Sequence, residues 1–201
     1  LELQKGSMLS IVAADFSMYA FEALRKELSE IEELRFIFTD PTFIQKENSK
    51  KEKREFYIPK INRERRIYGT EFEVKLRNEL NQKAIAKECA EWIKKKVTFK
   101  SNVGNKEITD RFIVLNDIAY YTVNSFTTVD LGCEQGNNMG VNILKLESPA
   151  SQAFIEQFAK LWQNEEELKD VTNNVISSIS SAYNENAPEF IYFVTLYNIF
   201  H

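Results

Sequence analysis

Two short apolar runs near the start of the chain flank a segment with a helical repeat. Residues 9–16 (LSIVAADF) and 34–40 (LRFIFTD) are mostly apolar and carry an Asp at or near their ends, which is typical of strands buried on both faces. Pro41 stops the second run. Strand, helix, strand within about thirty residues predicts a βαβ unit with a parallel pair and a right-handed crossover. The helical repeat between the runs, which predicts one helix, consists of Phe21, Leu24, Leu28 and Ile31.

A charged tract and a longer helical segment follow. Residues 45–66 carry many charges on both sides of one short apolar stretch. This pattern predicts a loop or a poorly ordered hairpin. A helix is predicted from Thr70, whose hydroxyl forms a capping box with Glu73, and a break is expected near Asn81. Residues 97–101 predict a short strand. The apolar stripes on either side of the expected break are Phe72, Leu76 and Leu80, then Ile85, Cys89 and Trp92.

The next apolar runs predict a hairpin and a further strand. Residues 112–115 and 119–123 are joined by Asn116-Asp117, which suits a tight turn because both side chains tolerate left-handed backbone. A glycine-rich loop at 132–140 leads into a strand at 141–147. The pattern as a whole predicts an α/β fold with a mixed central sheet and helices on both faces.

Two more helices are expected towards the end of the chain. Ser148-Pro149 is a favourable helix start, because Pro occupies the first turn at no cost. Residues 188–201 are apolar on nearly every face of a helix, so we expect 1–187 to form one domain and 188–201 to lead towards another. The alternative is a terminal helix buried in this domain or in a dimer. The inward positions are Phe154, Phe158, Leu161 and Trp162 in the first helix, and Leu168, Val171, Val175 and Ile179 in the second.

Charge is distributed unevenly along the 201 residues. The net charge is −4, yet residues 46–111 hold 19 Lys or Arg against 11 Asp or Glu, a balance of +8 between acidic flanks. Such a block is either a solvated helix face or the contact surface for an anionic partner, of which nucleic acid is the commonest. The longest apolar runs are far shorter than the ~20 residues of a membrane span.

Several kinds of chemistry are excluded by residue type. The single histidine, His201, is the last residue, so Ser-His-Asp, Cys-His and His-based zinc sites are not expected. Cys89 and Cys133 are far apart, without metal or redox spacing, which indicates a reduced, cytoplasmic protein. The loop at 132–140 lacks the Lys-Ser/Thr of a P-loop. The remaining catalytic hypothesis is a metal-dependent nuclease built on an acidic cluster of Asp15, Asp40 and Asp117.

The hairpin and its surroundings resemble the phospholipase D-like phosphodiesterases. The segments TDRFIVLN, TVNSFT (122–127) and FAKLW (158–162) follow the family's order of His-x-Lys-x4-Asp hairpin, Gly-Ser-x-Asn-like knuckle and closing helix, over residues 9–163. The family's reacting positions fall on Thr109, Arg111 and Asn116, and its knuckle on Asn124 and Ser125. Threonine without an activating base does not replace a nucleophilic histidine. The resemblance therefore implies a phospholipase D-like half-domain with a phosphodiester-shaped cleft that binds without cutting.

A narrower resemblance concerns REFYIP, YGTEFEVKLRNELNQ, AEWIKKKVTFKSN and FVTLYNIF. These segments look like the N-terminal phospholipase D-like module of certain bacterial Swi/Snf-type or DEAD/DEAH-box helicases. The resemblance implies a non-catalytic accessory domain that binds nucleic acid, most simply DNA. It also implies a following helicase motor in the same polypeptide, which alone would use ATP and magnesium. This stretch itself is expected to need no cofactor and no membrane.

The expected contact residues combine the basic block with the degenerate hairpin. Phosphate contacts by such residues would be independent of sequence and sensitive to salt. A homodimerisation or structural role is the main alternative, and it is compatible with nucleic-acid binding because two copies can present one groove. The contact residues are Lys94, Lys95, Lys96, Lys100, Arg111, Asn124 and Ser125.

Overall fold

The fold is that of a computed structural model, which describes residues 3–39, 71–103, 108–134 and 143–184. The predictions for the charged tract at 45–66, the cap at Thr70 and the apolar segment at 188–201 lie outside these ranges. Among the helices that the structure describes, none is long and apolar enough to cross a membrane.

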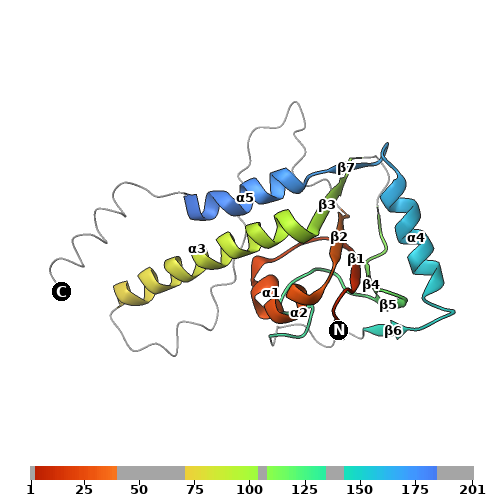
Figure 1. The fold of residues 1–201 in the computed structure, drawn as a ribbon, viewed down its shortest axis with the longest axis horizontal. Helices are drawn as coiled ribbons and strands as arrows, with labels where there is room; N and C mark the ends of the chain where they lie inside the picture. The colour runs from red at the N-terminus through yellow and green to blue at the C-terminus, as the bar shows by residue number, and fades with distance from the viewer. Residues whose placement is uncertain (1–2, 40–70, 104–107, 135–142, 185–201) are drawn as a thin grey trace.

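The described strands form a seven-stranded mixed sheet in the order β6-β5-β4-β1-β2-β3-β7, and α3 and α5 extend to one side of it (Figure 1). β1, β2 and β3 are parallel to one another, and every other neighbouring pair is antiparallel. The mixed α/β fold and the parallel pair predicted from the first two apolar runs are confirmed. The strands are β1 (Met8–Ala13), β2 (Glu33–Phe38), β3 (Val97–Asn102), β4 (Phe112–Leu115), β5 (Ile118–Tyr121), β6 (Leu144–Leu146) and β7 (Leu168–Asp170).

Alternate strand residues belong to two separate hydrophobic clusters, because successive side chains of a strand point to opposite faces of a sheet. In β1, Ile11 belongs to the larger cluster together with residues of α1, α2, α3 and α5. Val12 belongs to the smaller cluster, where Phe158 of α4 covers β1, β2 and β4. The helices are α1 (Met18–Ala23), α2 (Arg25–Glu30), α3 (Glu71–Lys96), α4 (Gln152–Gln163) and α5 (Thr172–Asn184).

Two predictions about helix continuity are wrong. The helix expected between the first two strands is divided at Leu24, which has φ −108° and ψ 19° and ends α1 while starting α2. In contrast, α3 continues through Asn81 for 26 residues. It contains no Gly or Pro, and the propensity cost of an Asn, below about 0.7 kcal/mol, does not break a helix of that length.

The last third of the described chain also departs from the prediction. Leu168 was expected in a helix but lies in β7, whose three residues pair antiparallel with β3. α5 begins only at Thr172, whose hydroxyl accepts the backbone N–H of Phe99 at 2.8 Å. Likewise α4 begins at Gln152 rather than at Ser148-Pro149. A three-residue edge strand is too short to carry a recognisable alternation of its own.

Candidate nucleic-acid interface

Polar residues gather where the parallel strands end, an edge that we call the carboxyl edge. Asp15 follows β1, Thr39 follows β2, and Asn102 is the last residue of β3. Arg111 directly precedes β4, which is antiparallel to β1, so its backbone lies at the same edge. Ligands of open α/β sheets bind beyond the carboxyl ends of the strands, which makes this edge the candidate site.

The segment 122–126 crosses the end of β4 and attaches to the chain beyond β1. It leaves β5 after Tyr121, which is paired with Phe112 of β4. The backbone oxygen of Asn124 then accepts the N–H of Ala14 at 3.1 Å, and Phe126 forms a parallel bridge with Phe16. This crossing brings the predicted knuckle of the hairpin to the carboxyl edge.

The crossing also pairs Ser125 with Asp15. Ser125 is nearly buried, and its hydroxyl donates to the carboxylate Oδ2 of Asp15 at 3.1 Å. The backbone N–H of Phe126 donates to the backbone oxygen of Asp15 at 2.8 Å. Asn124 is exposed. Asp15 therefore positions the crossing segment, a role that the strand-end Asp of the sequence did not reveal.

Arg111 is the one charged residue at this edge with a buried side-chain nitrogen that lacks an acceptor among the described residues. The residue is half-buried, and its Nε lies out of solvent without a hydrogen-bond acceptor. A buried donor without a partner costs about 1–3 kcal/mol, and more when the group is charged. A ligand oxygen that reaches this guanidinium recovers that cost.

Thr39 is a second buried group with an unmet hydrogen bond, and the sequence analysis did not identify it. The residue is 2% exposed, and its Oγ1 has no hydrogen-bond partner among the residues that the structure describes. Its backbone is fixed on both sides, because its N–H donates to Ala13 and its oxygen accepts Nδ2 of Asn102 at 3.3 Å. Only its position directly after an apolar strand could have indicated it.

Thr109 stands where the family resemblance places the nucleophile, and its side chain is exposed. It lies two residues before Arg111, on the approach to β4. Between them, Asp110 accepts a hydrogen bond from Nε2 of Gln157 on α4 at 2.9 Å. The approach to β4 is therefore tied to α4 by Asp110 and leaves Thr109 in solvent.

Asn116 lies at the opposite end of β4 and has a structural role. Its φ of 53° makes the β4–β5 turn, and its Oδ1 accepts the N–H of Met8 at 2.9 Å. Five residues of extended chain separate it from Arg111 by about 16 Å. The structure does not bring the third degenerate position to the carboxyl edge.

The acidic cluster expected for a metal-dependent nuclease is not assembled from the described residues. Asp117 shares the β4–β5 turn at the amino end of β1, whereas Asp15 lies beyond its carboxyl end. Asp40 lies outside the described residues. Among the residues that the structure describes, no group of three His, Cys, Asp or Glu is placed to hold a metal ion.

The lysines at the end of α3 also lie away from Arg111, because α3 leads into the amino end of β3. Nζ of Lys94 lies 2.7 Å from Oε1 of Glu91. Nζ of Lys96 donates to the backbone oxygens of Ser29 and Ile31, both at 2.6 Å, and so caps the end of α2. Lys94 and Lys95 are exposed, whereas Lys96 is committed to the fold.

Lys100 is committed to the fold as well. From β3 its Nζ donates to the Trp162 backbone oxygen in the last turn of α4 at 2.7 Å. The same ammonium lies 4.7 Å from the centroid of the Trp162 ring, within cation–π range. The predicted basic surface is thus divided between two edges, and two of its lysines cap helices.

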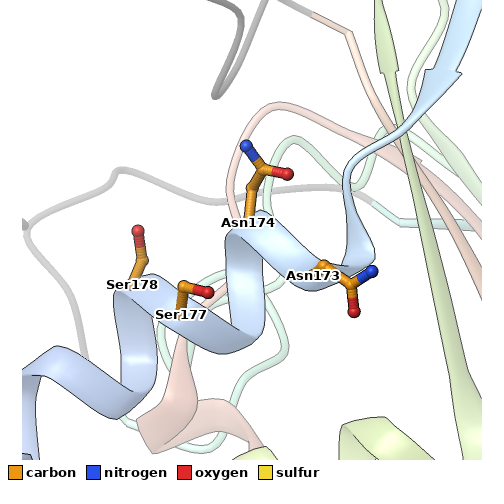
Figure 2. Close-up of a pocket in the computed structure, with 4 residues that line it drawn as sticks. All are labelled: Asn173, Asn174, Ser177 and Ser178. Atoms are coloured by element: carbon orange, nitrogen blue, oxygen red, sulfur yellow. The ribbon is translucent and has the colours of Figure 1, made fainter.

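A shallow hollow of about 370 Å³ lies on α5 (Figure 2). Its four labelled side chains, Asn173, Asn174, Ser177 and Ser178, all come from that single helix. The described lining contains no charged side chain and no group that could act as a nucleophile with an adjacent base.

The two thiols are poorly suited to nucleophilic chemistry. Burial raises the pKa of Cys89 to about 12. The pKa of Cys133 is also raised, first by partial burial and then by the nearby carboxylates of Glu134 and Glu27. Both are therefore protonated at neutral pH.

Comparison of the chain with models of known protein families, with curated proteins and with solved structures finds no match.

Proposed function

We propose that this chain is a non-catalytic nucleic-acid-binding module, which in its full polypeptide is an accessory domain of a DNA-dependent ATPase. The observation that carries the proposal is the buried Nε of Arg111 at the carboxyl edge of the sheet, which lacks an acceptor within the described parts of the chain. A phosphate oxygen is the natural acceptor, because a guanidinium offers a planar fork that matches phosphate geometry.

The neighbouring groups favour holding a phosphate over cleaving it. Asn124 is exposed beside Asp15 and offers an amide donor, and Thr109 offers a hydroxyl. Thr109 requires a general base to become a nucleophile, and the only histidine of the chain is His201. The edge therefore supplies donors for an anion without the group that would attack it.

The exposed lysines add a weaker, less localised contribution. Lys94 and Lys95 lie at the amino end of β3 and can meet backbone phosphates of a longer nucleic acid, in a contact that salt screens. Lys96 and Lys100 are left out of the proposed contact surface because their ammonium groups cap α2 and α4.

The proposal is tested by fluorescence anisotropy of labelled single-stranded and duplex DNA over a range of salt concentrations. Arg111→Gln should weaken binding about tenfold, the equivalent of one charge-assisted hydrogen bond. The slope of log affinity against log salt should fall by about 0.9 for duplex DNA. Lys26→Gln is the matched control, since Lys26 is an exposed cation on α2, away from the carboxyl edge, and should change the affinity less than twofold.

Two results would overturn the proposal. One is the absence of any salt-dependent binding by the wild-type chain at low ionic strength. The other is plasmid cleavage in magnesium or manganese that Asp15→Asn abolishes, because that result assigns catalysis to the same edge.

A further inference from the structure

A pocket of about 190 Å³ lies between α4 and the sheet, near the amino end of β1. Its sheet side is lined by Ser10 of β1, Arg35 of β2 and Val114 of β4. Its helix side is lined by Ala159 and Trp162 of α4. It is separate from the carboxyl edge, since Ser10 lies in the amino-terminal half of β1 and Asn116 lies in the β4–β5 turn, at the end of β4 away from Arg111.

The pocket exists because small and polar residues replace apolar ones at the centre of the sheet. Ser10 is paired with Arg35 on one side and with Val114 on the other, so the three side chains share a face. Central strands of parallel sheets usually carry continuous apolar residues. Ser10 and Ala159 are too small to fill the space between sheet and helix, and the charged Arg35 is placed beside it.

Arg35 has donors to spare in the part of the chain that the structure describes. Its Nε and Nη2 both donate to Oε2 of Glu33, at 3.0 and 2.8 Å, and among the described residues no acceptor engages Nη1. Its Cζ lies 5.9 Å from the Trp162 ring centroid. Lys100 lies on the same ring and Glu33 is the opposing carboxylate, so Arg35, Lys100 and Glu33 together carry one net positive charge.

The pocket also has an apolar wall. Phe158 stacks on Trp162 with centroids 5.6 Å apart, and both line the cavity together with Val114. Ligand pockets usually enclose about 300 Å³ or more, so this one suits a small molecule only. An anion with a small apolar body matches both halves of the lining.

We propose that this pocket binds a small organic carboxylate that carries an apolar group. The carboxylate accepts from Nη1 of Arg35 and from the Ser10 hydroxyl, and the apolar group packs against Phe158 and Val114. Arg recognises carboxylates through short, charge-assisted hydrogen bonds, which distinguishes such a ligand from a neutral analogue. This inference goes beyond the proposed nucleic-acid binding and does not depend on it.

The test uses benzoate as the probe and benzamide as its neutral control of the same shape. Backbone amide NMR shifts of the whole chain are followed during titration of each compound. Benzoate should shift amides of β1, β2 and α4 and saturate, and benzamide should bind at least tenfold more weakly. Arg35→Met should weaken benzoate binding at least tenfold, because it keeps an unbranched apolar stem and removes the donors.

Two filling variants and one distant variant complete the test. Ser10→Val and Ala159→Leu occupy the pocket from the sheet and from the helix, and each should abolish saturable benzoate binding while the rest of the spectrum stays folded. Arg111→Gln should leave benzoate binding unchanged, so failure here is separable from failure of nucleic-acid binding. Equal binding of benzoate and benzamide, or benzoate binding that survives both folded filling variants, would overturn the proposal.

Discussion

Two polar residues of the same hairpin, Arg111 and Asn116, have different roles because of the register of one strand pair. Val12 of β1 lies opposite Phe112 and Leu9 lies opposite Leu115, so β4 carries its two flanking residues to opposite ends of β1. Arg111 reaches the carboxyl edge, where its Nε meets no acceptor in the described structure, whereas the Asn116 side chain accepts the backbone N–H of Met8. Sequence spacing alone placed both in one site.

The structural role of Asn116 predicts the cost of replacing it. Asn116→Ala should lower the free energy of unfolding by about 2 kcal/mol, because Ala is strained at φ 53° and the bond to the Met8 N–H is lost. Asn116→Gly should cost about 1 kcal/mol, since Gly adopts this backbone without strain. Urea denaturation of both variants measures the difference, with the exposed Asn124→Ala as the control expected within about 0.5 kcal/mol. Equal costs for the two Asn116 variants would contradict the backbone argument.

The two cysteines make a second contrast at the residue scale. Cys133 is exposed, and Cys89 is buried in the larger cluster with its pKa raised to about 12. A thiol reagent at neutral pH should modify one thiol in the native chain and two after denaturation, and Cys133→Ser should abolish the native reaction.

The same pKa shift has a consequence for stability at high pH. Because the folded pKa of Cys89 is raised from 9.0, its contribution to stability is present below pH 9.0 and is lost as the pH rises towards about 12. Cys89→Ala should weaken this alkaline decline in urea denaturation. Rapid native labelling of Cys89 would show that α3 opens locally.

At the scale of elements, the end of α3 is fastened to α2. Nζ of Lys96 donates to Ser29 and Ile31, and Nε1 of Trp92 donates to the Leu28 oxygen at 3.2 Å. These bonds satisfy the free carbonyls at the end of α2, where a cation is also favoured by the helix dipole. The three consecutive lysines are therefore not equivalent.

This difference is measurable by substitution of neighbouring residues. Lys96→Met should lower the free energy of unfolding by about 1–3 kcal/mol, because two charge-assisted hydrogen bonds are lost and the apolar stem is kept. Lys95→Met, at the exposed neighbouring position, should change it by less than about 0.5 kcal/mol. In DNA binding the order should reverse, with the larger loss for Lys95→Met. If Lys96→Met had the larger effect on both stability and DNA binding, or Lys95→Met had the larger effect on both, the distinction between a capping and a binding lysine would be wrong.

The elements show which parts of the fold follow from local sequence. β1, β2, β4 and the inward face of α4 were predicted from apolar patterns, because each such pattern reflects burial within one element. The break at Leu24 and the strand β7 depend on distant partners, since α1 packs on α3 and β7 exists through its pairing with β3. The candidate site divides in the same way. The motif layout only singled out Arg111 and Ser125 as candidates, while the capping roles of Lys96 and Lys100 depend on contacts between residues more than sixty positions apart in the sequence.

At the scale of the whole molecule, the order of the strands places the candidate binding residue Arg111 beside a central strand and away from the exposed edge strand β6. β1 and β2 are central, with neighbours on both sides and buried residues such as Ile11 and Phe36. β6 is an edge strand of three residues, and Leu144 there is 54% exposed. Arg111, whose Nε has no acceptor among the described residues, lies beside the carboxyl end of the central strand β1.

This arrangement predicts a gradient of local stability across the sheet, which native-state hydrogen exchange measures. Amides of β1 and β2 should open only with global unfolding, whereas those of β6 should exchange by local opening at least about a hundredfold faster, a difference of about 3 kcal/mol. The gradient should not change with protein concentration if β6 is a free edge. Protection of β6 that equals that of β2 and rises with concentration would instead show that a second copy pairs along this edge. The proposed function also favours a rigid β1 with slow exchange up to Ala13. If the carboxyl edge were mobile, nucleic-acid binding would have to order it, and that loss of conformational entropy would weaken the affinity. An edge that is already ordered in the folded protein avoids this loss.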